Sequence, residues 1–206
     1  MIKAVIFDMG SVLIGAEWRI IYKRIAKKLR LSEEKVKKIS RPLLDKWNIG
    51  KINEREFWKG FEEQLGRKID CSFTKNLWFR SHINYVRDIR ESWKIIAELR
   101  AKKVLLAIIS NTIPPHVQSH RKTGRISKLR KLGVKFFIWS CSVGLRKPNP
   151  KIYKIALKKL KLPAKEYIFI DDKLAHIKAA KKLGMIGIHF QTPKKLKKDL
   201  IKLGVL

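Results

Sequence analysis

Five short apolar runs predict the strands of a buried sheet. Each is nearly continuous in apolarity and rich in β-branched or aromatic residues, as strands covered on both faces are. They lie at residues 3–8, 104–110, 135–140, 167–171 and 186–190, and helical patterns occupy 91–102, 114–132, 150–160 and 175–183. This alternation predicts an α/β fold with a parallel, doubly wound, Rossmann-like sheet.

The stretch 16–88 breaks the alternation, because it carries only helical patterns. Trp18, Ile21, Ile25 and Leu29 recur at spacings of three and four and form one apolar stripe. Ser32 has the features of a helix N-cap, and Asn53 with Glu56 has the spacing of a capping box. A further helix is predicted at 72–85.

This organisation predicts two domains. Residues 1–15 and 89–206 form an α/β core, and residues 16–88 form an all-helical domain inserted after the first strand. The aromatic residues of the insertion are either core or substrate pocket, and their helical spacing favours core. They are Trp18, Tyr22, Trp47, Phe57, Trp58 and Trp78. An amphipathic helix at 193–203 is expected to dock on the core.

The net charge adds a possible partner class. Forty-nine Lys and Arg residues against seventeen Asp and Glu give a formal charge of +32, which attracts polyanions and phosphorylated ligands. The basic residues are spread along the whole chain, and no nucleic-acid-binding motif accompanies them. We therefore expect a general affinity for anions and do not favour nucleic acid as the functional partner.

Targeting features are absent from the sequence. No run of about 18 apolar residues is present, and the first residues lack the pattern of a secretory signal. Cys71 and Cys141 are far apart and are expected to be reduced, half-buried thiols. These observations predict a cytoplasmic protein without a membrane partner. They leave its oligomeric state open.

Polar residues follow three of the predicted strands. In open parallel sheets, the functional site lies outside the carboxyl ends of the strands. The strand ends deliver Asp8 after the first strand, Ser110 and Asn111 after the second, and Asp171 and Asp172 after the fourth. Lys147 lies in a basic loop that opens the helix at 150–160. We expect these groups to lie close together.

This set of groups suits phosphoryl transfer. A carboxylate such as Asp8 can attack phosphorus in line and form an acyl phosphate. A serine hydroxyl can hold the phosphate oxygens, and a lysine can neutralise the charge of the transition state. Asp8, Asp172 and a backbone carbonyl near Gly10 offer the hard oxygen ligands that Mg²⁺ prefers. Because neighbouring carboxylates repel one another, we expect a bound Mg²⁺.

Four motifs occur in the order typical of the haloacid dehalogenase superfamily. Residues 5–13 (Val-Ile-Phe-Asp-Met-Gly-Ser-Val-Leu) resemble the first motif, Ser110-Asn111 the second, Lys147-Pro148 the third and Ile170-Asp171-Asp172 the fourth. Residues 143–153 resemble the phosphatase-like branch that carries a helical cap. The resemblance covers essentially the whole chain.

The resemblance implies a role for each motif residue. It implies Asp8 as nucleophile, Lys147 as charge stabiliser, Ser110 and Asn111 as substrate-binding groups, Mg²⁺ ligands at Asp8, the Gly10 carbonyl and Asp172, and Asp171 as support for Lys147 or the metal shell. The helical stretch 16–88 resembles the cap that closes over the substrate.

Two positions depart from the family pattern. Most phosphatases of the family carry, two residues after the nucleophile, an aspartate that protonates the leaving group and activates water; here that position is Gly10. Such help is typically worth about 10²–10⁴-fold, so we expect a slow or inactive enzyme, or one that needs a good leaving group, unless a water or Glu17 substitutes. His176 stands where relatives often carry Asn or Asp, and we expect it on the helix surface near the site rim.

Three functions remain open at this level. The favoured one is a Mg²⁺-dependent phosphomonoester hydrolase that acts on a small phosphorylated metabolite through an aspartyl-phosphate intermediate. The second is a catalytically impaired relative that binds anions or nucleic acid through its basic surface. The third, less favoured, is a 2-haloacid dehalogenase, which uses the same aspartate without metal. The sequence does not specify the substrate.

Overall fold

The computed structural model describes residues 1–15 and 18–206, and the side chains of Trp18 and Arg19 are outside the description. Glu17, the substitute acid considered above, therefore lies outside the described residues. The five strands are β1 (Ala4–Phe7), β2 (Leu105–Ser110), β3 (Val134–Trp139), β4 (Tyr167–Asp171) and β5 (Ile186–His189). They form one parallel sheet in the order β3-β2-β1-β4-β5.

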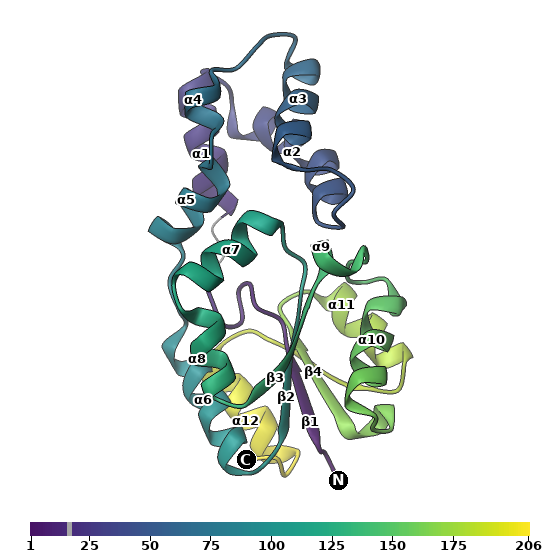
Figure 1. Cartoon of the computed structure of the whole chain (residues 1–206). Helices are drawn as coiled ribbons and strands as arrows, with labels where there is room; N and C mark the ends of the chain where they lie inside the picture. The colour runs from purple at the N-terminus through teal and green to yellow at the C-terminus, as the bar shows by residue number, and fades with distance from the viewer. Residues whose placement is uncertain (16–17) are drawn as a thin grey trace.

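Helices cover both faces of this sheet (Figure 1). The helices of the α/β part are α6 (Arg90–Ala101), α7 (Pro114–Lys122), α8 (Arg125–Lys131), α9 (Ser140–Val143), α10 (Pro150–Leu160), α11 (Leu174–Lys182) and α12 (Pro193–Lys202), with a short 3₁₀ turn at Ala164–Glu166. Val5 and Phe7 of β1 pack with α6, α8 and α12, whereas Ala4 and Ile6 pack with α10 and α11. Because alternate strand residues point to opposite faces, both faces of β1 are buried. The predicted doubly wound α/β fold is confirmed.

The helical block consists of α1 (Trp18–Leu29), α2 (Glu33–Trp47), α3 (Glu54–Leu65), α4 (Cys71–Thr74) and α5 (Leu77–Tyr85). The Ser32 hydroxyl accepts a hydrogen bond from the Lys35 amide at 3.1 Å, which confirms the predicted N-cap. Asn53 and Glu56 exchange side-chain-to-backbone hydrogen bonds of 3.0 and 2.8 Å, which confirms the capping box.

The helical block has a hydrophobic core of its own. Trp47, Phe57, Trp58 and Trp78 are buried in it, with ring centroids of Phe57 5.1 Å from Trp47 and 5.3 Å from Trp78. Tyr22 is partly buried against the same cluster. The prediction that these aromatic residues serve as core is confirmed for the described side chains.

The helical block stands beyond the carboxyl ends of the strands (Figure 1). Its two connections to the sheet run side by side, since the Gly15 amide donates to the Arg87 carbonyl and the Ile89 amide to the Leu13 carbonyl, both at 2.9 Å. Asp45 of α2 forms an ion pair with Arg146 in the loop before α10. The block is thus held over the edge of the sheet where the polar strand-end residues lie.

Two predicted helices are each divided in the structure. The helix expected at 114–132 ends at Lys122 and resumes at Arg125, because Gly124 adopts a left-handed conformation (φ +72°). The helix expected at 72–85 is interrupted between α4 and α5, where Asn76 is also left-handed (φ +55°). Both single-helix predictions were wrong, since apolar periodicity continues through two-residue breaks of this kind.

Two general predictions can also be compared with the structure. Both cysteines are free; Cys141 is partly buried as expected, whereas Cys71 is exposed, contrary to expectation, because it opens the short surface helix α4. Within the described part of the chain, no helix combines the length and apolarity needed to cross a membrane.

Candidate active site

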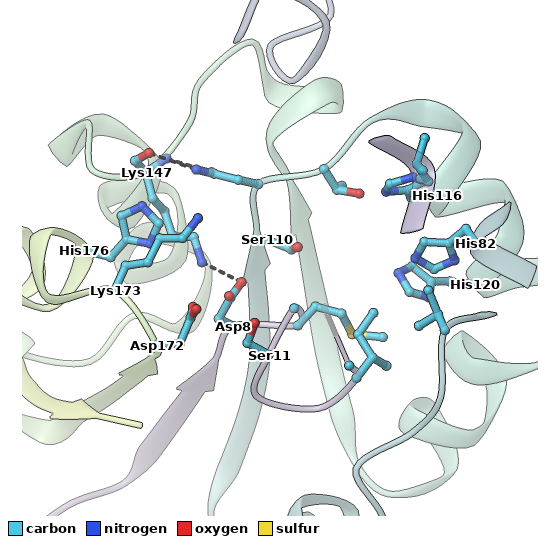
Figure 2. Close-up of a pocket in the computed structure, with 18 residues that line it drawn as sticks. Asp8, Ser11, His82, Ser110, His116, His120, Lys147, Asp172, Lys173 and His176 are labelled. Atoms are coloured by element: carbon cyan, nitrogen blue, oxygen red, sulfur yellow. Dashed lines mark hydrogen bonds and ion pairs between the residues drawn. The ribbon is translucent and has the colours of Figure 1, made fainter. Parts of the chain in front are cut away.

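The carboxyl ends of β1, β2 and β4 bring the predicted residues together. Phe7 pairs with Ile108 on one side and Ile170 on the other, so Asp8, Ser110 and Asp171 lie at adjacent strand ends. A cavity of about 230 Å³ opens over this edge of the sheet (Figure 2). Its lining includes Asp8, Gly10, Ser110, Asn111, Lys147 and Asp172. Of the predicted site residues, Asp171 alone is outside the lining and is fully buried.

Lys147 is buried completely and joins two carboxylates. Its Nζ donates hydrogen bonds to Asp8 Oδ1 at 2.7 Å, to Asp171 Oδ2 at 2.7 Å and to the Ile109 carbonyl at 2.9 Å. All three donors of the ammonium group are therefore used. The side chain of Asn111 fixes the Lys147 backbone, because its amide nitrogen donates to the Lys147 carbonyl at 2.9 Å and its oxygen accepts from the Lys147 amide at 2.8 Å.

These charges set the pKa values of the buried groups. Burial, together with the charge of Asp171, raises the pKa of Asp8 to about 6 against the opposing effect of Lys147. Burial also opposes ionisation of Asp171, but the hydrogen bond from His176 and the charge of Lys147 outweigh it and hold its pKa at about 2. Burial would lower the pKa of Lys147, yet the two carboxylates raise it above its ordinary value. Lys147 is therefore a permanent cation beside Asp8.

His176 is buried, so the expectation of a surface position was wrong. Its Nδ1 lies 2.9 Å from both carboxylate oxygens of Asp171. Because an ionised carboxylate only accepts hydrogen bonds, Nδ1 carries the proton. The position is buried because α11 packs against β4 and β5, and the Tyr153 hydroxyl donates to the His176 carbonyl at 3.0 Å. His176 thus orients Asp171, which in turn holds Lys147.

The acidic residues of the site suit a divalent cation. Asp8, Asp171 and Asp172 each offer a carboxylate oxygen within 4.8 Å of the others. Both oxygens of Asp171 are already engaged, one by Lys147 and the other by the Lys173 amide at 2.9 Å. The Asp172 carboxylate accepts no hydrogen bond from another described residue, and burial followed by the charge of Asp171 raises its pKa. The hard oxygens of Asp8 and Asp172 therefore fit a cation such as Mg²⁺, whereas Asp171 fits the support of Lys147.

The loop after β1 places Gly10 in the cavity lining. This loop is a tight turn in which the Leu13 and Ile14 amides donate to the Met9 carbonyl at 2.9 and 3.1 Å. A Cβ atom added at Gly10 would meet no atom within 4 Å, and the backbone there is not left-handed. Neither space nor backbone conformation requires glycine at this position. The aspartate that most phosphatases of the family carry here is therefore missing without a steric reason.

Sequence reasoning missed a cluster of three histidines in the same cavity. His82 of α5 and His116 and His120 of α7 line the wall across from Asp172 and Lys173 (Figure 2). All three are buried, with the ring centroid of His82 4.3 Å from that of His116 and 4.7 Å from that of His120. The available signal was the spacing of His116 and His120, which lie four residues apart and so on one face of the helix that follows Ser110 and Asn111.

The histidine cluster predicts a loss of stability as the pH falls. Burial lowers the pKa of His116 and of His120 from 6.5 to about 3, with further lowering from the charges of His120 and Arg125 respectively. Between pH 6.5 and 3 the unfolded chain therefore binds protons that the folded protein does not. Each histidine then costs up to about 1.4 kcal/mol of unfolding free energy per pH unit.

Urea unfolding at pH 7 and pH 5 measures this effect. Titrating carboxylates contribute equally to the wild type and to His120→Leu, so the difference between the two isolates one imidazole. We expect the variant to lose less unfolding free energy than the wild type on acidification. Equal losses would contradict a depressed pKa at His120.

The fold and the site together define an α/β enzyme whose polar residues gather at the carboxyl edge of a parallel sheet. The family model of the haloacid dehalogenase-like hydrolases matches residues 2–184. The chain therefore belongs to the haloacid dehalogenase-like hydrolases, and the resemblance stated from its motifs is confirmed.

Individual relatives give the same family and include phosphatases. A sesquiterpene phosphatase of Aspergillus oryzae is 26% identical over 204 residues, covering 91% of this chain and 89% of the relative. A D-ribitol-5-phosphate phosphatase of Bacteroides thetaiotaomicron is 27% identical over 190 residues, covering 89% of each chain. The crystal structure of a haloacid dehalogenase family enzyme of the same bacterium, in complex with magnesium and inorganic phosphate, matches with a TM-score of 0.73 at 23% identity and covers 93% of this chain and 95% of that one.

Proposed function

We propose that the protein is a Mg²⁺-dependent phosphomonoester hydrolase that acts on a small phosphorylated metabolite through an aspartyl-phosphate intermediate on Asp8. The observation that carries the proposal is the buried Lys147, which contacts Asp8 and Asp171 beneath a cavity lined by Ser110 and Asp172. The phosphatases among the relatives and the magnesium- and phosphate-bound structure support the same chemistry.

Each residue has a role in this mechanism. The Asp8 carboxylate attacks phosphorus, and the ester oxygen leaves on the opposite side, because such displacements run in line. Lys147 offsets the negative charge that collects on the phosphoryl oxygens. The Ser110 hydroxyl and the backbone at Asn111 bind those oxygens, while the Asn111 side chain keeps the lysine loop in place. Water then cleaves the acyl phosphate and restores Asp8.

A metal ion completes the charge balance of this site. Asp8, the Gly10 carbonyl and Asp172 are the groups that would hold Mg²⁺, and Asp171 is reserved for Lys147. When bound, the ion supplies positive charge that stabilises the phosphate and the neighbouring carboxylates.

Asp172→Asn is expected to weaken Mg²⁺ binding at least about tenfold, because one of the two carboxylates open to the cation becomes neutral. Titration calorimetry with Mg²⁺ alone measures this without any turnover. Asp199→Asn is the matched control, since Asp199 pairs with Lys195 on α12, away from the cavity. Equal Mg²⁺ affinity of Asp172→Asn and the wild type would remove Asp172 as a ligand.

Gly10→Asp is expected to raise turnover of phosphate esters with poor leaving groups by about 10²-fold, because the new carboxyl can protonate the departing oxygen. A side chain can be introduced at this position, as no atom lies within 4 Å of an added Cβ. Steady-state kinetics on an alkyl phosphate tests this, with Gly10→Asn as a control of the same shape that lacks the acid. If both variants match the wild type, another group already acts as the general acid.

The helical block stands beyond the carboxyl ends of the strands (Figure 1). We propose that residues 16–88 form a cap domain over the core of residues 1–15 and 89–206, and that the protein acts in the cytoplasm. Contacts of the block with the core support this division, because they are made with α7 and α8 and with the loop before α10, on the carboxyl side of the sheet.

Hydrolysis of an aryl phosphate with and without Mg²⁺ tests the proposed function. We expect turnover that requires the metal and is inhibited by phosphate analogues. Absence of both turnover and phosphate-analogue binding would overturn the proposal. A salt-sensitive shift of random-sequence nucleic acid at physiological ionic strength, in the absence of turnover, would favour the anion-binding alternative instead.

A further inference from the structure

Three buried imidazoles form one wall of the active-site cavity. His82, His116 and His120 face the space above Asp8 and Ser110 (Figure 2). They belong to α5 of the helical block and to α7 of the core, so the wall spans both parts of the protein. In the described chain, the acidic cluster is the one set of three side chains whose potential metal-ligating atoms converge, and the three imidazoles do not form such a set.

The imidazoles are uncharged at neutral pH. Burial, together with neighbouring imidazoles or Arg125, lowers the pKa of each of the three, to about 3 at His116 and His120. Arg125 lies behind the wall and is itself neutralised by Asp88, whose Oδ1 accepts from its Nε at 2.6 Å. A neutral imidazole offers one hydrogen-bond donor and one acceptor. The wall therefore presents polar groups without net charge.

One of these polar atoms has no partner in the described protein. His82 uses Nδ1 for a hydrogen bond of 2.8 Å with the Ser119 hydroxyl. His120 is only 2% exposed, and its ring stacks on that of Trp139 with 5.9 Å between the ring centroids. Its Nδ1 nevertheless makes no hydrogen bond to any described residue. A buried polar atom without a partner costs about 1–3 kcal/mol. A ligand with a hydroxyl group can supply the missing bond.

The charged groups of the cavity lie away from this wall. The described charged residues of the lining are Asp8, Lys147, Asp172 and Lys173, which gather in the centre and on the other side of the cavity (Figure 2). The phosphate of the substrate would bind among these charged residues, so the rest of the substrate would extend toward the histidines. A carboxylate or second phosphate there would find no cation among the described lining residues, and an alkyl chain would leave Nδ1 of His120 without a hydrogen-bond partner. A cavity of about 230 Å³ also admits only a small group.

We propose that His82, His116 and His120 bind the leaving group, and that the substrate is the phosphate monoester of a small, uncharged alcohol with several hydroxyl groups. This inference rests on the proposed function, because it assigns the group that leaves from the phosphate at Asp8. The three histidines are specificity-determining residues in it and supply no step of the phosphoryl transfer.

Three phosphates of equal chain length test the proposed substrate class: a pentitol 5-phosphate, pentyl phosphate and a 5-phosphopentonate. We expect kcat/KM for the pentitol ester to exceed that for pentyl phosphate by about 10²-fold or more, because a site built for hydroxyl groups rejects analogues that lack them. The carboxylate of the pentonate should lower kcat/KM at least about tenfold. Equal or better turnover of pentyl phosphate or the pentonate would overturn the inference while leaving a Mg²⁺-dependent phosphatase intact.

Binding separates the inference from the proposed function. Asp8→Asn keeps the cavity and removes the nucleophile, so calorimetry on this variant compares the pentitol and pentyl esters without turnover. Tighter binding of the pentitol ester supports the histidine wall whether or not the wild type is active. Equal binding of the two esters contradicts it.

His120→Leu tests the role of one imidazole. We expect the preference for the pentitol over the pentyl ester to fall about tenfold, the worth of one buried hydrogen bond. His120→Asn, which retains a donor and an acceptor, should restore part of the preference. At pH 7 His120→Leu should unfold at the same temperature as the wild type or higher, since it removes a buried polar atom without a described partner. An unchanged preference in His120→Leu would exclude a role of this imidazole in substrate choice.

Discussion

Asp8→Asn is expected to abolish phosphatase activity, with a loss of at least about 10⁴-fold in kcat. An amide neither attacks phosphorus nor accepts the phosphoryl group, so no acyl phosphate can form. The fold should persist, because Lys147 keeps its bonds to Asp171 and the Ile109 carbonyl. Steady-state kinetics with saturating Mg²⁺, together with thermal unfolding, measures both parts of the prediction.

Two controls make the Asp8 result specific. Asp88→Asn changes another acidic residue, one that pairs with Arg125 behind the histidine wall, and should retain turnover. The circular dichroism of Asp8→Asn should match that of the wild type. Substantial turnover by Asp8→Asn would exclude Asp8 as the nucleophile.

Lys147→Met is expected to cause the largest loss of stability among substitutions in the site. It leaves the buried carboxylates of Asp8 and Asp171 without their shared cation, and removal of one partner from a buried ion pair typically costs about 3–5 kcal/mol. Turnover should also be lost, since no other cation contacts both Asp8 and Asp171 in the described chain. Urea unfolding at neutral pH gives the change in unfolding free energy.

Lys151→Met is the matched control for Lys147→Met. Lys151 lies four residues further on, at the exposed start of α10, and forms no ion pair in the described structure. We expect its substitution to change the unfolding free energy by less than about 0.5 kcal/mol. Similar unfolding free energies of the two variants would mean that the buried carboxylates of Asp8 and Asp171 do not need the Lys147 cation for stability.

The sheet could be predicted from the sequence because its strands are buried on both faces. Continuous apolar runs predicted both ends of all five strands to within one residue, and local signals such as the Asn53 capping box were also predicted. The breaks within the two divided helices were not predicted, because a single left-handed residue such as Gly124 does not interrupt the apolar pattern around it.

The site was predictable where residues follow strands and not where they come from helices. Topology places Asp8, Ser110 and Asp172 at one edge of the sheet, so strand order alone brings them together. His82 reaches the cavity from the end of the helical block, and its contact with α7 depends on how the two parts pack. His176 was misplaced for a similar reason, since only the packing of α11 shows that it turns inward to Asp171.

The most direct test of the account is to trap the phosphoryl group on the protein. With Gly10 in place of the acid that would activate water, hydrolysis of the intermediate should be slower than its formation from an ester with a good leaving group. Acid quench of a single turnover with a ³²P-labelled acyl or sugar 1-phosphate, followed by peptide mapping, should find Mg²⁺-dependent, hydroxylamine-labile label on the peptide that carries Asp8. Label on another residue, or product release in a burst with no label on the protein, would contradict the aspartyl-phosphate mechanism.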